Sequence, residues 1–434
     1  MYPTRASLIA VVSVALTFGA NVEAEVALDP EQKLGQTLYL DRNLSFNGNQ
    51  SCADCHSLNP SNDPKTGKPM SAAGFIDPRN VENGSPVSEG SVAGRFGSLN
   101  APSAGYAAFS PFFHWNSAEG LYVGGQFWNG RANTLAEQAG GPFLNPVEMA
   151  MPNQWSVVSR LKGRSDYVKA FKTLYGLDLA RIPDFDPKIP DALAPLGVEK
   201  AYENITRAIA AFEKSRVFNR FDSKYDFHLA GRTELSPQER LGLDLFTGRG
   251  KCSDCHVSKP GVAPDGTVLP PLFTDFTYDN LGLPRNADIP GNPVPDKGLG
   301  GRADIAARGP KGGELGKHKV MSLRNIALTA PYGHNGVFAT MEQITHFYNT
   351  RDVLGRVADN RDPDFGVKGW PAPEVTQNVN REELGDLGLT SEEEAAIVAF
   401  MRTLTDGYPR WGKDPKVPPG TPSPFAEMLL PPFP

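Results

Sequence analysis

Two copies of one short motif, Cys-x-x-Cys-His, constrain this chain more than any other feature. One copy ends at His56 and the other at His256, and together they use all four cysteines of the 434 residues. Two thiols at this spacing can form thioethers with both vinyl groups of one haem, and the histidine directly after them can bind the haem iron. The motifs therefore predict two covalently bound c-type haems, attached through Cys52, Cys55, His56, Cys252, Cys255 and His256.

Three other interpretations of the cysteines fit the sequence less well. A zinc site would have to join two pairs from distant parts of the chain, and it would leave both histidines without a role. Thioredoxin-like redox pairs are expected within a β-α-β unit, and the sequence around the motifs shows none. Two local disulfides would not explain why the histidine occurs twice, and four cysteines are too few for a disulfide scaffold in a chain of this length.

Each motif follows a segment with the same helix-forming pattern, which indicates an internal duplication. The segments 28–39 and 235–246 each begin with a capping residue, then proline, and then glutamine or glutamate three residues after the cap. The caps are Asp29 and Ser236. Leucines four residues apart then give each segment one apolar face. Because cap, apolar face and motif occur twice in the same order, we predict two related domains.

The predicted fold class is mainly α, with two cytochrome c-like haem domains and long loops. The domains are expected at residues 25–216 and 217–434. Glycine and proline number 44 and 39 residues, which is more than an average chain contains. They cluster in residues 59–125 and 257–317, so we expect these stretches to be mostly loop, with at most a short hairpin.

Two further helices can be predicted from local patterns. Apolar residues from Val198 to Phe212 recur at helical spacing, which predicts a helix that ends the first domain near Arg216. Near the C-terminus, Ser391 followed by Glu394 predicts the capped start of another helix.

The first 24 residues have the features of a signal peptide. Arg5 precedes an apolar run over residues 8–20 that is short for a membrane span, and small residues end the segment at Ala24. An uncleaved membrane anchor is the alternative, but Glu23 follows the run too closely for it. The sequence predicts cleavage near Ala24, export to the periplasm, and a mature protein with no membrane span.

Composition excludes some classes of protein. Hydrophobic residues make up 40% of the chain, which allows a packed core and excludes wholesale disorder. The formal net charge is −6, and the chain contains no run of basic residues. This argues against nucleic acid as a partner.

Two longer stretches resemble the bacterial di-haem cytochrome c peroxidase family, which also includes the MauG enzymes that oxidise a protein substrate. The first comprises residues 127–138, 141–142 and 145–149, and the second comprises residues 322–325 and 328–336. The likeness extends over nearly the whole chain after residue 24, with the motifs in the family's order. It implies that the haem attached at His56 reacts with peroxide and that the haem at His256 transfers electrons.

The resemblance also implies roles for three residues of the first stretch. Trp128 matches the tryptophan between the two haems, although core packing is the ordinary role of such a residue. Gln138 and Glu148 match the pair above the peroxide-reactive haem. A carboxylate can move a proton between the two peroxide oxygens, and an amide can orient the peroxide. Without the motif, a lone glutamate would be expected on the surface.

A calcium ion is a further implication of the resemblance. Asn100, Thr329 and Pro331 match positions around the ion that the family holds between its domains. The last two would contribute carbonyl oxygens, and oxygen donors suit calcium. The alternative is ordinary turn structure, since asparagine and proline are common in turns.

The chain departs from the family's pattern above the first haem. Many family peroxidases place a histidine on this haem in the resting oxidised state, in the loop before the tryptophan motif. The histidine of this region is His114, and it lies in an apparent insertion from Ser110 to Gly124. We therefore expect the sixth position of the first haem iron to be open or occupied by water. His114 as a ligand is the alternative.

A second departure concerns the sixth ligand of the second haem. The family peroxidases have methionine where this chain has Tyr348, and MauG has tyrosine there. Met341, about two helical turns (~10 Å) earlier, is the rival ligand, and core packing is its alternative role. Methionine raises the haem potential, whereas a phenolate favours ferric and higher states. Tyr348 therefore keeps a MauG-like function open.

The leading hypothesis is a di-haem peroxidase that reduces hydrogen peroxide to water with electrons from a small c-type cytochrome or cupredoxin. The first alternative is MauG-like oxidation of a partner protein. Against it, none of the five tryptophans lies just before the second haem motif, where MauG carries a surface tryptophan. The second alternative is a non-enzymatic di-haem electron carrier. A homodimer is compatible with the sequence.

Overall fold

The computed structural model describes residues 26–61, 72–262, 268–291, 294–307 and 313–428. Within these ranges the chain is rich in helix and contains only small sheets. No helix of the described ranges is long and apolar enough to cross a membrane. The predicted signal peptide, residues 1–24, lies outside the described residues.

Thirteen α-helices occur in the described ranges, and most of them are short. In the first half of the chain they are α1 (Pro30–Tyr39), α2 (Cys52–Cys55), α3 (Pro78–Asn83), α4 (Leu135–Leu144), α5 (Gln154–Leu161), α6 (Ser165–Tyr175) and α7 (Val198–Glu213). In the second half they are α8 (Lys224–Leu229), α9 (Pro237–Thr247), α10 (Ala303–Ala306), α11 (Met341–Thr350), α12 (Ser391–Arg402) and α13 (Tyr408–Trp411).

The strands are two or three residues long and pair into four two-stranded sheets within the described residues. They are β1 (His114–Asn116), β2 (Leu121–Val123), β3 (Gly261–Val262), β4 (Val268–Leu269), β5 (Tyr278–Asp279), β6 (His318–Lys319), β7 (Gly355–Arg356) and β8 (Gly369–Trp370). The β7–β8 pair is parallel and the other three pairs are antiparallel. The expectation of at most one short hairpin was wrong, because strands of two residues are too short to show an alternating pattern.

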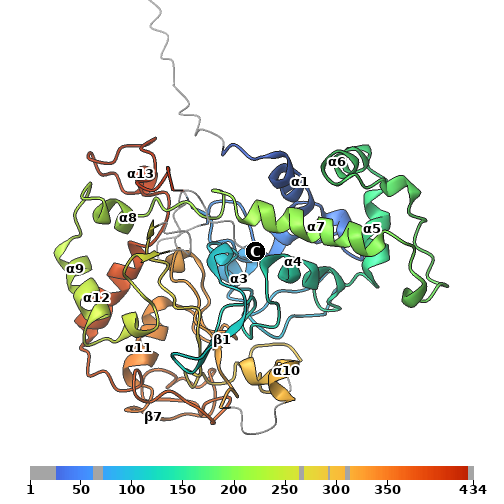
Figure 1. Cartoon of the computed structure of the whole chain (residues 1–434). Helices are drawn as coiled ribbons and strands as arrows, with labels where there is room; N and C mark the ends of the chain where they lie inside the picture. Colours follow the sequence, from blue (N-terminus) through green and yellow to red (C-terminus); the bar gives the residue numbers. More distant parts are fainter. Residues whose placement is uncertain (1–25, 62–71, 263–267, 292–293, 308–312, 429–434) are drawn as a thin grey trace, which may run out of the picture.

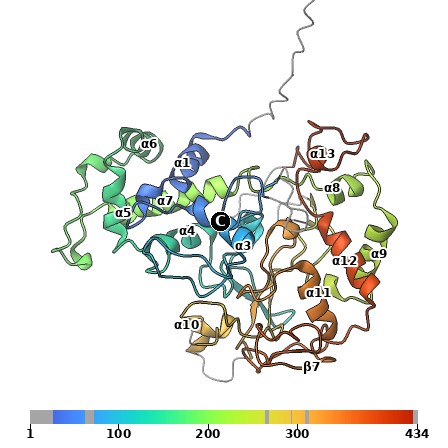
Figure 2. The same cartoon turned by 180° about the vertical axis from the view of Figure 1, so that it is seen from behind.

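The helices from the two halves of the chain lie on opposite sides of the molecule (Figures 1 and 2). On one side are α1, α4, α5, α6 and α7, and on the other are α8, α9, α11, α12 and α13, with α3 between them in both views. Each group has its own core of buried apolar side chains. One core is drawn from residues 34–218 and the other from residues 225–404.

The two helix-forming segments that indicated a duplication make the same packing contact twice. α1 packs on α7, and α9 packs on α12. A Cβ atom at Gly35 would lie 1.9 Å from the carbonyl oxygen of Ala208, and a Cβ atom at Gly242 would lie 1.9 Å from that of Ala396. Glycine has no Cβ, so it lets the two backbones approach this closely. The repeated crossing therefore depends on a glycine at the same place in each half.

The caps of these helices agree with the sequence patterns, with one exception. Asp29 and Ser236 cap α1 and α9, each in a reciprocal pair with the residue three positions later, as predicted. The predicted cap of α12 was wrong by one residue, because Thr390 and not Ser391 is the cap and accepts a hydrogen bond from the backbone of Glu393. A hydroxyl residue with glutamate three positions later occurs in both registers, so the pattern alone does not choose between them.

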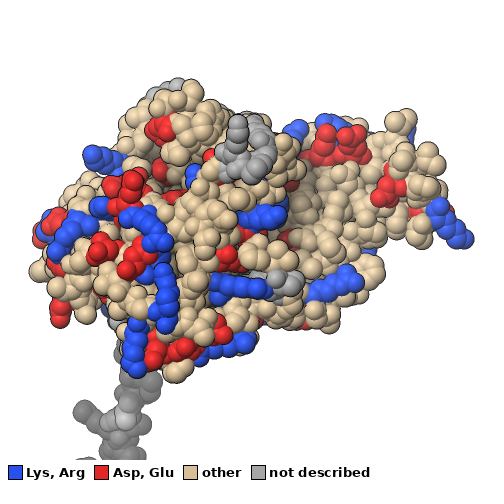
Figure 3. Space-filling view, turned by 90° about the horizontal axis from the view of Figure 1, so that it is seen from below, with Lys and Arg blue, Asp and Glu red and all other residues tan. Residues whose placement is uncertain are grey.

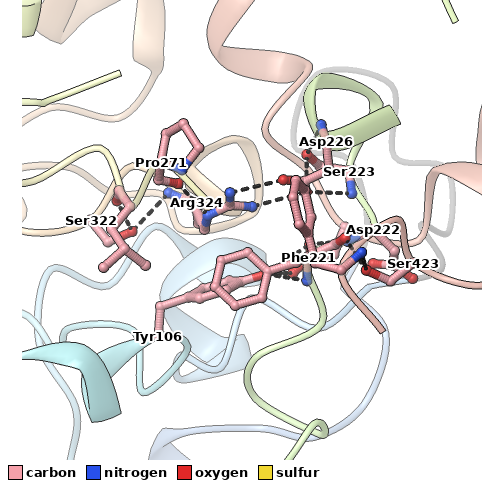
Figure 4. Close-up of polar contacts among 12 residues, drawn as sticks. Tyr106, Phe221, Asp222, Ser223, Asp226, Pro271, Ser322, Arg324 and Ser423 are labelled. Carbon is pink, nitrogen blue, oxygen red and sulfur yellow. Dashed lines mark hydrogen bonds and ion pairs between the residues drawn. The ribbon is translucent and has the colours of Figure 1, made fainter. Parts of the chain in front are cut away.

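A buried polar network joins the two groups of helices (Figure 4). Arg324 donates to both carboxylate oxygens of Asp226 at 2.9 and 3.0 Å, and both side chains are fully buried. Tyr106, from the first half, donates to the carboxylate of Asp406, from the second half, at 2.9 Å. The same hydroxyl accepts a hydrogen bond from the backbone N–H of Phe221. The network thus connects distant segments of the chain through fully buried groups.

Candidate active site

A cavity of about 490 Å³ brings the first motif together with two residues of the resemblance. Cys52, Cys55 and His56 lie in its wall, and so do Gln138 and Glu148. The motif forms the single turn α2, and the backbone N–H of His56 donates to the carbonyl of Cys52 at 2.8 Å. None of the four cysteines, all of which are described, is in a disulfide. Two free thiols, an imidazole, a carboxyl and an amide therefore surround one space.

A second cavity, of about 170 Å³, contains the second motif. Cys252, Cys255 and His256 lie in its wall together with Tyr348 from α11. The Tyr348 phenol is enclosed, and burial raises its pKa. Met341, at the first turn of the same helix, is buried in the apolar core and is not among the residues that line this cavity. Of the two rival ligands, Tyr348 is the one that shares a cavity with the second motif.

The two motif histidines are held in the same way. The Nδ1 atom of His56 lies 3.2 Å from the carbonyl oxygen of Phe75, and that of His256 lies 2.8 Å from the carbonyl oxygen of Phe273. Both phenylalanines have a positive φ, 53° and 55°, which is uncommon for a residue with a large side chain. Burial lowers the pKa of both imidazoles. A neutral ring that donates through Nδ1 has the lone pair of Nε2 available for a metal.

The residues that line each cavity have the chemistry that a covalently attached haem requires. Each encloses space beside two free thiols and one imidazole, and each has mainly apolar walls, as the faces of a porphyrin require. The surroundings of the two spaces differ, because Glu148 and Gln138 line only the first and Tyr348 lines only the second, where the acids are Asp279 and Glu383. The two sites are therefore equipped for different chemistry.

Glu148 lies just after helix α4, which carries Gln138. Its Oε1 atom accepts a 2.6 Å hydrogen bond from Nδ2 of Asn145. Burial raises the pKa of Glu148, although Arg131 and Asn145 oppose the shift. The guanidinium of Arg131 lies 3.4 Å above the ring of Phe127, in the motif that resembles the family. A carboxyl can accept and return a proton, and burial favours its protonated form.

Trp128 lies in the wall of both cavities. Its Nε1 donates to the carbonyl of Asn100 at 2.8 Å, and its carbonyl accepts a 2.8 Å hydrogen bond from the backbone N–H of Lys319. The edge of its ring contacts His334, with the ring centroids 6.4 Å apart. An indole fixed in this way between two cavities can pass an electron between them.

His114 is exposed and lies on β1, which pairs with β2 in a hairpin. Its Nδ1 atom is 2.8 Å from the carbonyl oxygen of Phe112. It is not among the described residues that line the first cavity. The structure therefore does not bring His114 to the first motif.

The three residues associated with calcium all belong to the wall of the first cavity. They are Asn100, Thr329 and Pro331. The backbone N–H of Asn100 donates to the carbonyl of His334 at 2.8 Å, and its Nδ2 donates to the carbonyl of Pro86 at 3.0 Å. These bonds use the nitrogen atoms of Asn100, whose backbone carbonyl oxygen accepts the indole N–H of Trp128. Oxygen atoms are the ligands that calcium prefers.

Two buried ionisable residues had no signal in the sequence. Glu213 ends α7, lines the first cavity, is 6% exposed, and has an Oε2 atom with no hydrogen-bond partner among the described residues. Burial raises its pKa to about 8. Lys319 in β6 lines both cavities and donates to Oγ of Ser110 and to the carbonyl of Gly125, each at 2.5 Å. Burial lowers the pKa of Lys319 to about 7.

Two stacked histidines lie beside the second cavity. The rings of His318 and His334 are nearly parallel, with centroids 3.6 Å apart. Nε2 of His318 is 2.9 Å from the carboxylate of Asp296, and Nε2 of His334 is 3.3 Å from that of Glu374. Burial opposes ionisation of Asp296, but the hydrogen bond with His318 lowers its pKa to about 2. Burial and the neighbouring His318 lower the pKa of His334 to about 4.

The chain is similar to several known proteins. A family model described as di-haem cytochrome c peroxidase matches residues 29–234. The methylamine utilization protein MauG of Paracoccus denitrificans (strain Pd 1222) is 38% identical over 395 residues, which cover 89% of this chain and 92% of MauG. Cytochrome c551 peroxidase of Nitrosomonas europaea is 30% identical over 402 residues, which cover 91% of this chain and 86% of that protein. The crystal structure of the diheme peroxidase BthA from Burkholderia thailandensis E264 matches with a TM-score of 0.66 and 29% identity, over 88% of this chain and 87% of BthA.

Proposed function

Because the chain belongs to the di-haem cytochrome c peroxidase and MauG family, whose members carry two c-type haems, we propose that it reduces hydrogen peroxide to water with electrons from a small redox protein. The observation that carries this proposal is the first cavity, which encloses Glu148 and Gln138 together with His56. A non-enzymatic electron carrier, the second alternative, has no use for an acid and an amide beside a haem.

The chemistry follows from the groups around the first cavity. Reduction of one peroxide consumes two electrons and two protons and releases two water molecules. A haem held at His56 supplies the iron that binds peroxide and stores oxidising equivalents. Glu148 takes the proton from one peroxide oxygen and returns it to the leaving oxygen, and Asn145 holds the carboxyl in place. The amide of Gln138 orients the peroxide.

The haems are proposed to attach at the two motifs, where the imidazole of each motif would bind a haem iron. The attachment residues are Cys52, Cys55, His56, Cys252, Cys255 and His256. Tyr348 is proposed as the sixth ligand of the second haem, because it lines that cavity and Met341 does not. Trp128 is proposed to pass electrons between the haems, since it belongs to the walls of both cavities.

The division into two domains, 25–216 and 217–434, is supported by the two separate cores and by the repeated helix crossing. A calcium ion is proposed at Asn100, Thr329 and Pro331. Because the carbonyl of Asn100 accepts the indole N–H of Trp128, an ion there would also help to hold the indole between the haems.

We place the protein in the periplasm, because residues 1–24 resemble a signal peptide and c-type haem is attached outside the cytoplasm. The proposed electron donor is a small c-type cytochrome or cupredoxin. Figure 3 shows acidic and basic side chains interspersed on the face seen from below. That face carries no broad patch of one sign, so it would not select a donor by its net charge.

MauG-like oxidation of a partner protein is the second candidate, and one observation favours it. Tyr348 lies with the second motif, and an anionic phenolate on the haem iron stabilises oxidised states. The two functions require different fates for the oxidising equivalents. A peroxidase returns to its resting state as soon as a reduced cytochrome is present, whereas a MauG-like enzyme holds the equivalents until its partner protein binds.

Steady-state kinetics with the holoprotein separates the two functions. We expect hydrogen peroxide to oxidise a reduced small c-type cytochrome over many turnovers per molecule of protein. A rate no greater than that of the uncatalysed mixture would overturn the peroxidase proposal. A long-lived oxidised state after peroxide addition, unaffected by the reduced cytochrome, would support the MauG-like function instead.

A further inference from the structure

The insertion between Ser110 and Gly124 places an oxidisable side chain on the surface. Trp115, in β1, is 49% exposed, and Phe112 shortly before it is 50% exposed. Trp115 pairs across the hairpin with Tyr122 of β2. The peroxide chemistry proposed above leaves this hairpin without a role.

A series of consecutive aromatic ring contacts leads from Trp115 to the interior. The ring of Trp115 meets that of Tyr122 edge-on, with centroids 4.8 Å apart. Tyr122 stacks on Phe113 at 5.2 Å with an angle of 5° between the planes, and Phe113 meets Tyr278 edge-on at 6.0 Å. Phe113, Tyr122 and Tyr278 are buried and belong to one apolar cluster. A single line of ring contacts therefore joins the solvent to the interior.

The inner end of this line reaches the wall between the two cavities. Tyr278 in β5 pairs with Lys319 in β6, and the backbone N–H of Lys319 donates to the carbonyl of Trp128. The hydroxyl of Tyr278 packs against Gly130, where a Cβ atom would lie 2.2 Å from the hydroxyl oxygen. Asp279, the residue after Tyr278, lines the second cavity. The last ring thus lies against the segment that follows the relay tryptophan, and the next residue in the strand belongs to the wall of the second haem site.

The chemistry of the rings suits electron transfer along this line. Indole and phenol rings give up an electron far more readily than a phenyl ring, so Trp115, Tyr122 and Tyr278 are its redox-active members. Phe113 only bridges two of them, and the guanidinium of Arg302 lies 3.7 Å above its ring. That positive charge disfavours an electron vacancy on Phe113.

We propose that Trp115 is the site at which the donor protein delivers its electrons, and that Tyr122, Phe113 and Tyr278 conduct them towards Trp128. This inference rests on the proposed peroxidase function. The donor that fits is a small redox protein with an apolar patch around its redox centre, since Trp115 and Phe112 present an apolar, aromatic surface. Trp115 gives one electron inward and regains one from the donor, twice for each peroxide reduced, and no atom is transferred.

The test compares two reductants of the holoprotein, a reduced small c-type cytochrome and hydroquinone. Trp115→Phe is expected to lower kcat/KM for the cytochrome by about tenfold or more, and to lower the rate with hydroquinone much less. Tyr278→Phe is expected to show the same selective loss, although Tyr278 is buried and cannot touch the donor. Trp411→Phe is the matched control. Its indole packs on Tyr408, and neither residue lines either haem cavity, so we expect wild-type rates with both reductants.

The outcomes distinguish the route from the function on which it rests. Wild-type oxidation of the cytochrome by Trp115→Phe would overturn the inference and leave the peroxidase function intact. A loss in Trp115→Phe without a loss in Tyr278→Phe would show that the hairpin only docks the donor, and would also overturn the route. If the wild-type protein reduced no peroxide with either reductant, the proposed function would fail and the inference with it. After peroxide is added without donor, a spin-trap adduct located on Trp115 by mass spectrometry would support the route.

Discussion

Glu213, in the first half of the molecule, is an acid at a position where the second half has the hydrophobic residue Met401. It follows Phe212 in α7, and the corresponding crossing helix α12 has Met401 after Phe400. Burial raises the pKa of Glu213 from the ordinary value of 4.5 to about 8. Between these pH values the folded protein binds a proton that the unfolded chain releases. The contribution of this residue to stability therefore falls as pH rises from 4.5 to 8.

Replacing this carboxyl with an amide should remove that pH dependence. For Glu213→Gln we expect a free energy of unfolding close to wild type at pH 5, and higher than wild type by up to a few kcal/mol at pH 8. Denaturant unfolding of the holoprotein at both pH values measures the difference. Glu203→Gln, at an exposed position of the same helix, is the control and should show no such difference. An equal effect of Glu213→Gln at both pH values would contradict the account.

Tyr348 gives a spectroscopic prediction at the second haem. Tyr348→Met should replace the spectrum of a phenolate-ligated ferric haem with that of a methionine-ligated one, and should raise the potential of that haem. Electron paramagnetic resonance of the oxidised protein and a redox titration measure the two effects. Met341→Leu should change neither, because Met341 belongs to the apolar core. The assignment of Tyr348 would be wrong if its replacement left the low-spin signal unchanged.

Local motifs identify some of the site residues and miss others. Glu148 and Trp128 stand in a recognisable stretch of sequence, so their place in the cavity walls could be anticipated. Glu213 and Lys319 stand in no motif. Their altered pKa values come from burial by segments distant in the sequence, such as the contacts that Lys319 makes with Ser110. Burial of this kind is a property of the fold and leaves no local pattern.

At the scale of elements, the close approach of the helices at Gly242 gives a direct test of the packing. In Gly242→Ala the new methyl group would lie 1.9 Å from the carbonyl oxygen of Ala396, so the helices α9 and α12 would have to separate. We expect a loss of stability of about 1–3 kcal/mol or more, as for other overpacked sites. Thermal unfolding measures it. Gly261→Ala is the matched control, since a Cβ atom there would meet nothing within 4 Å. Equal melting temperatures for the two variants would contradict the packing described.

The elements that the sequence predicted well are those with long local patterns. The capping boxes at Asp29 and Ser236 and the apolar stripe of α7 each extend over several residues, and all three occur in the structure. Most strands were missed because they are only two or three residues long, and in one pair, where Tyr278 meets Lys319, the partners are also far apart in the sequence. A segment of two residues has no periodicity of its own.

At the scale of the whole molecule, Tyr106 couples the two halves. Its hydroxyl donates to Asp406 and accepts from the backbone of Phe221, and all three groups are buried. Tyr106→Phe leaves a buried carboxylate and a buried N–H without this partner, so we expect a loss of about 1–3 kcal/mol in the free energy of unfolding. Tyr175→Phe is the control. The Tyr175 hydroxyl donates a hydrogen bond to Glu31, which is partly buried and belongs to the same half of the molecule. Similar losses in both variants would argue against a coupling role for Tyr106.

The two halves share a helix crossing, a motif and a way of holding the histidine, yet they surround their haem sites with different groups. The first has Glu148 and Gln138, which suit the cleavage of peroxide, and the second has Tyr348, which suits the storage of an oxidising equivalent. Trp128 lies between them. The function we propose thus depends on a duplicated scaffold whose two sites have diverged.

The most direct test of this account is the peroxide dependence of turnover in Glu148→Gln. The amide keeps the shape of the side chain and cannot move the proton, so kcat/KM for hydrogen peroxide should fall by about 10²–10⁴-fold. The absorption spectra of both haems should remain those of the wild type, which would show that attachment and ligation are intact. A Glu148→Gln protein that reduced peroxide with the wild-type kcat/KM would contradict the central claim that the first cavity is the peroxidase site.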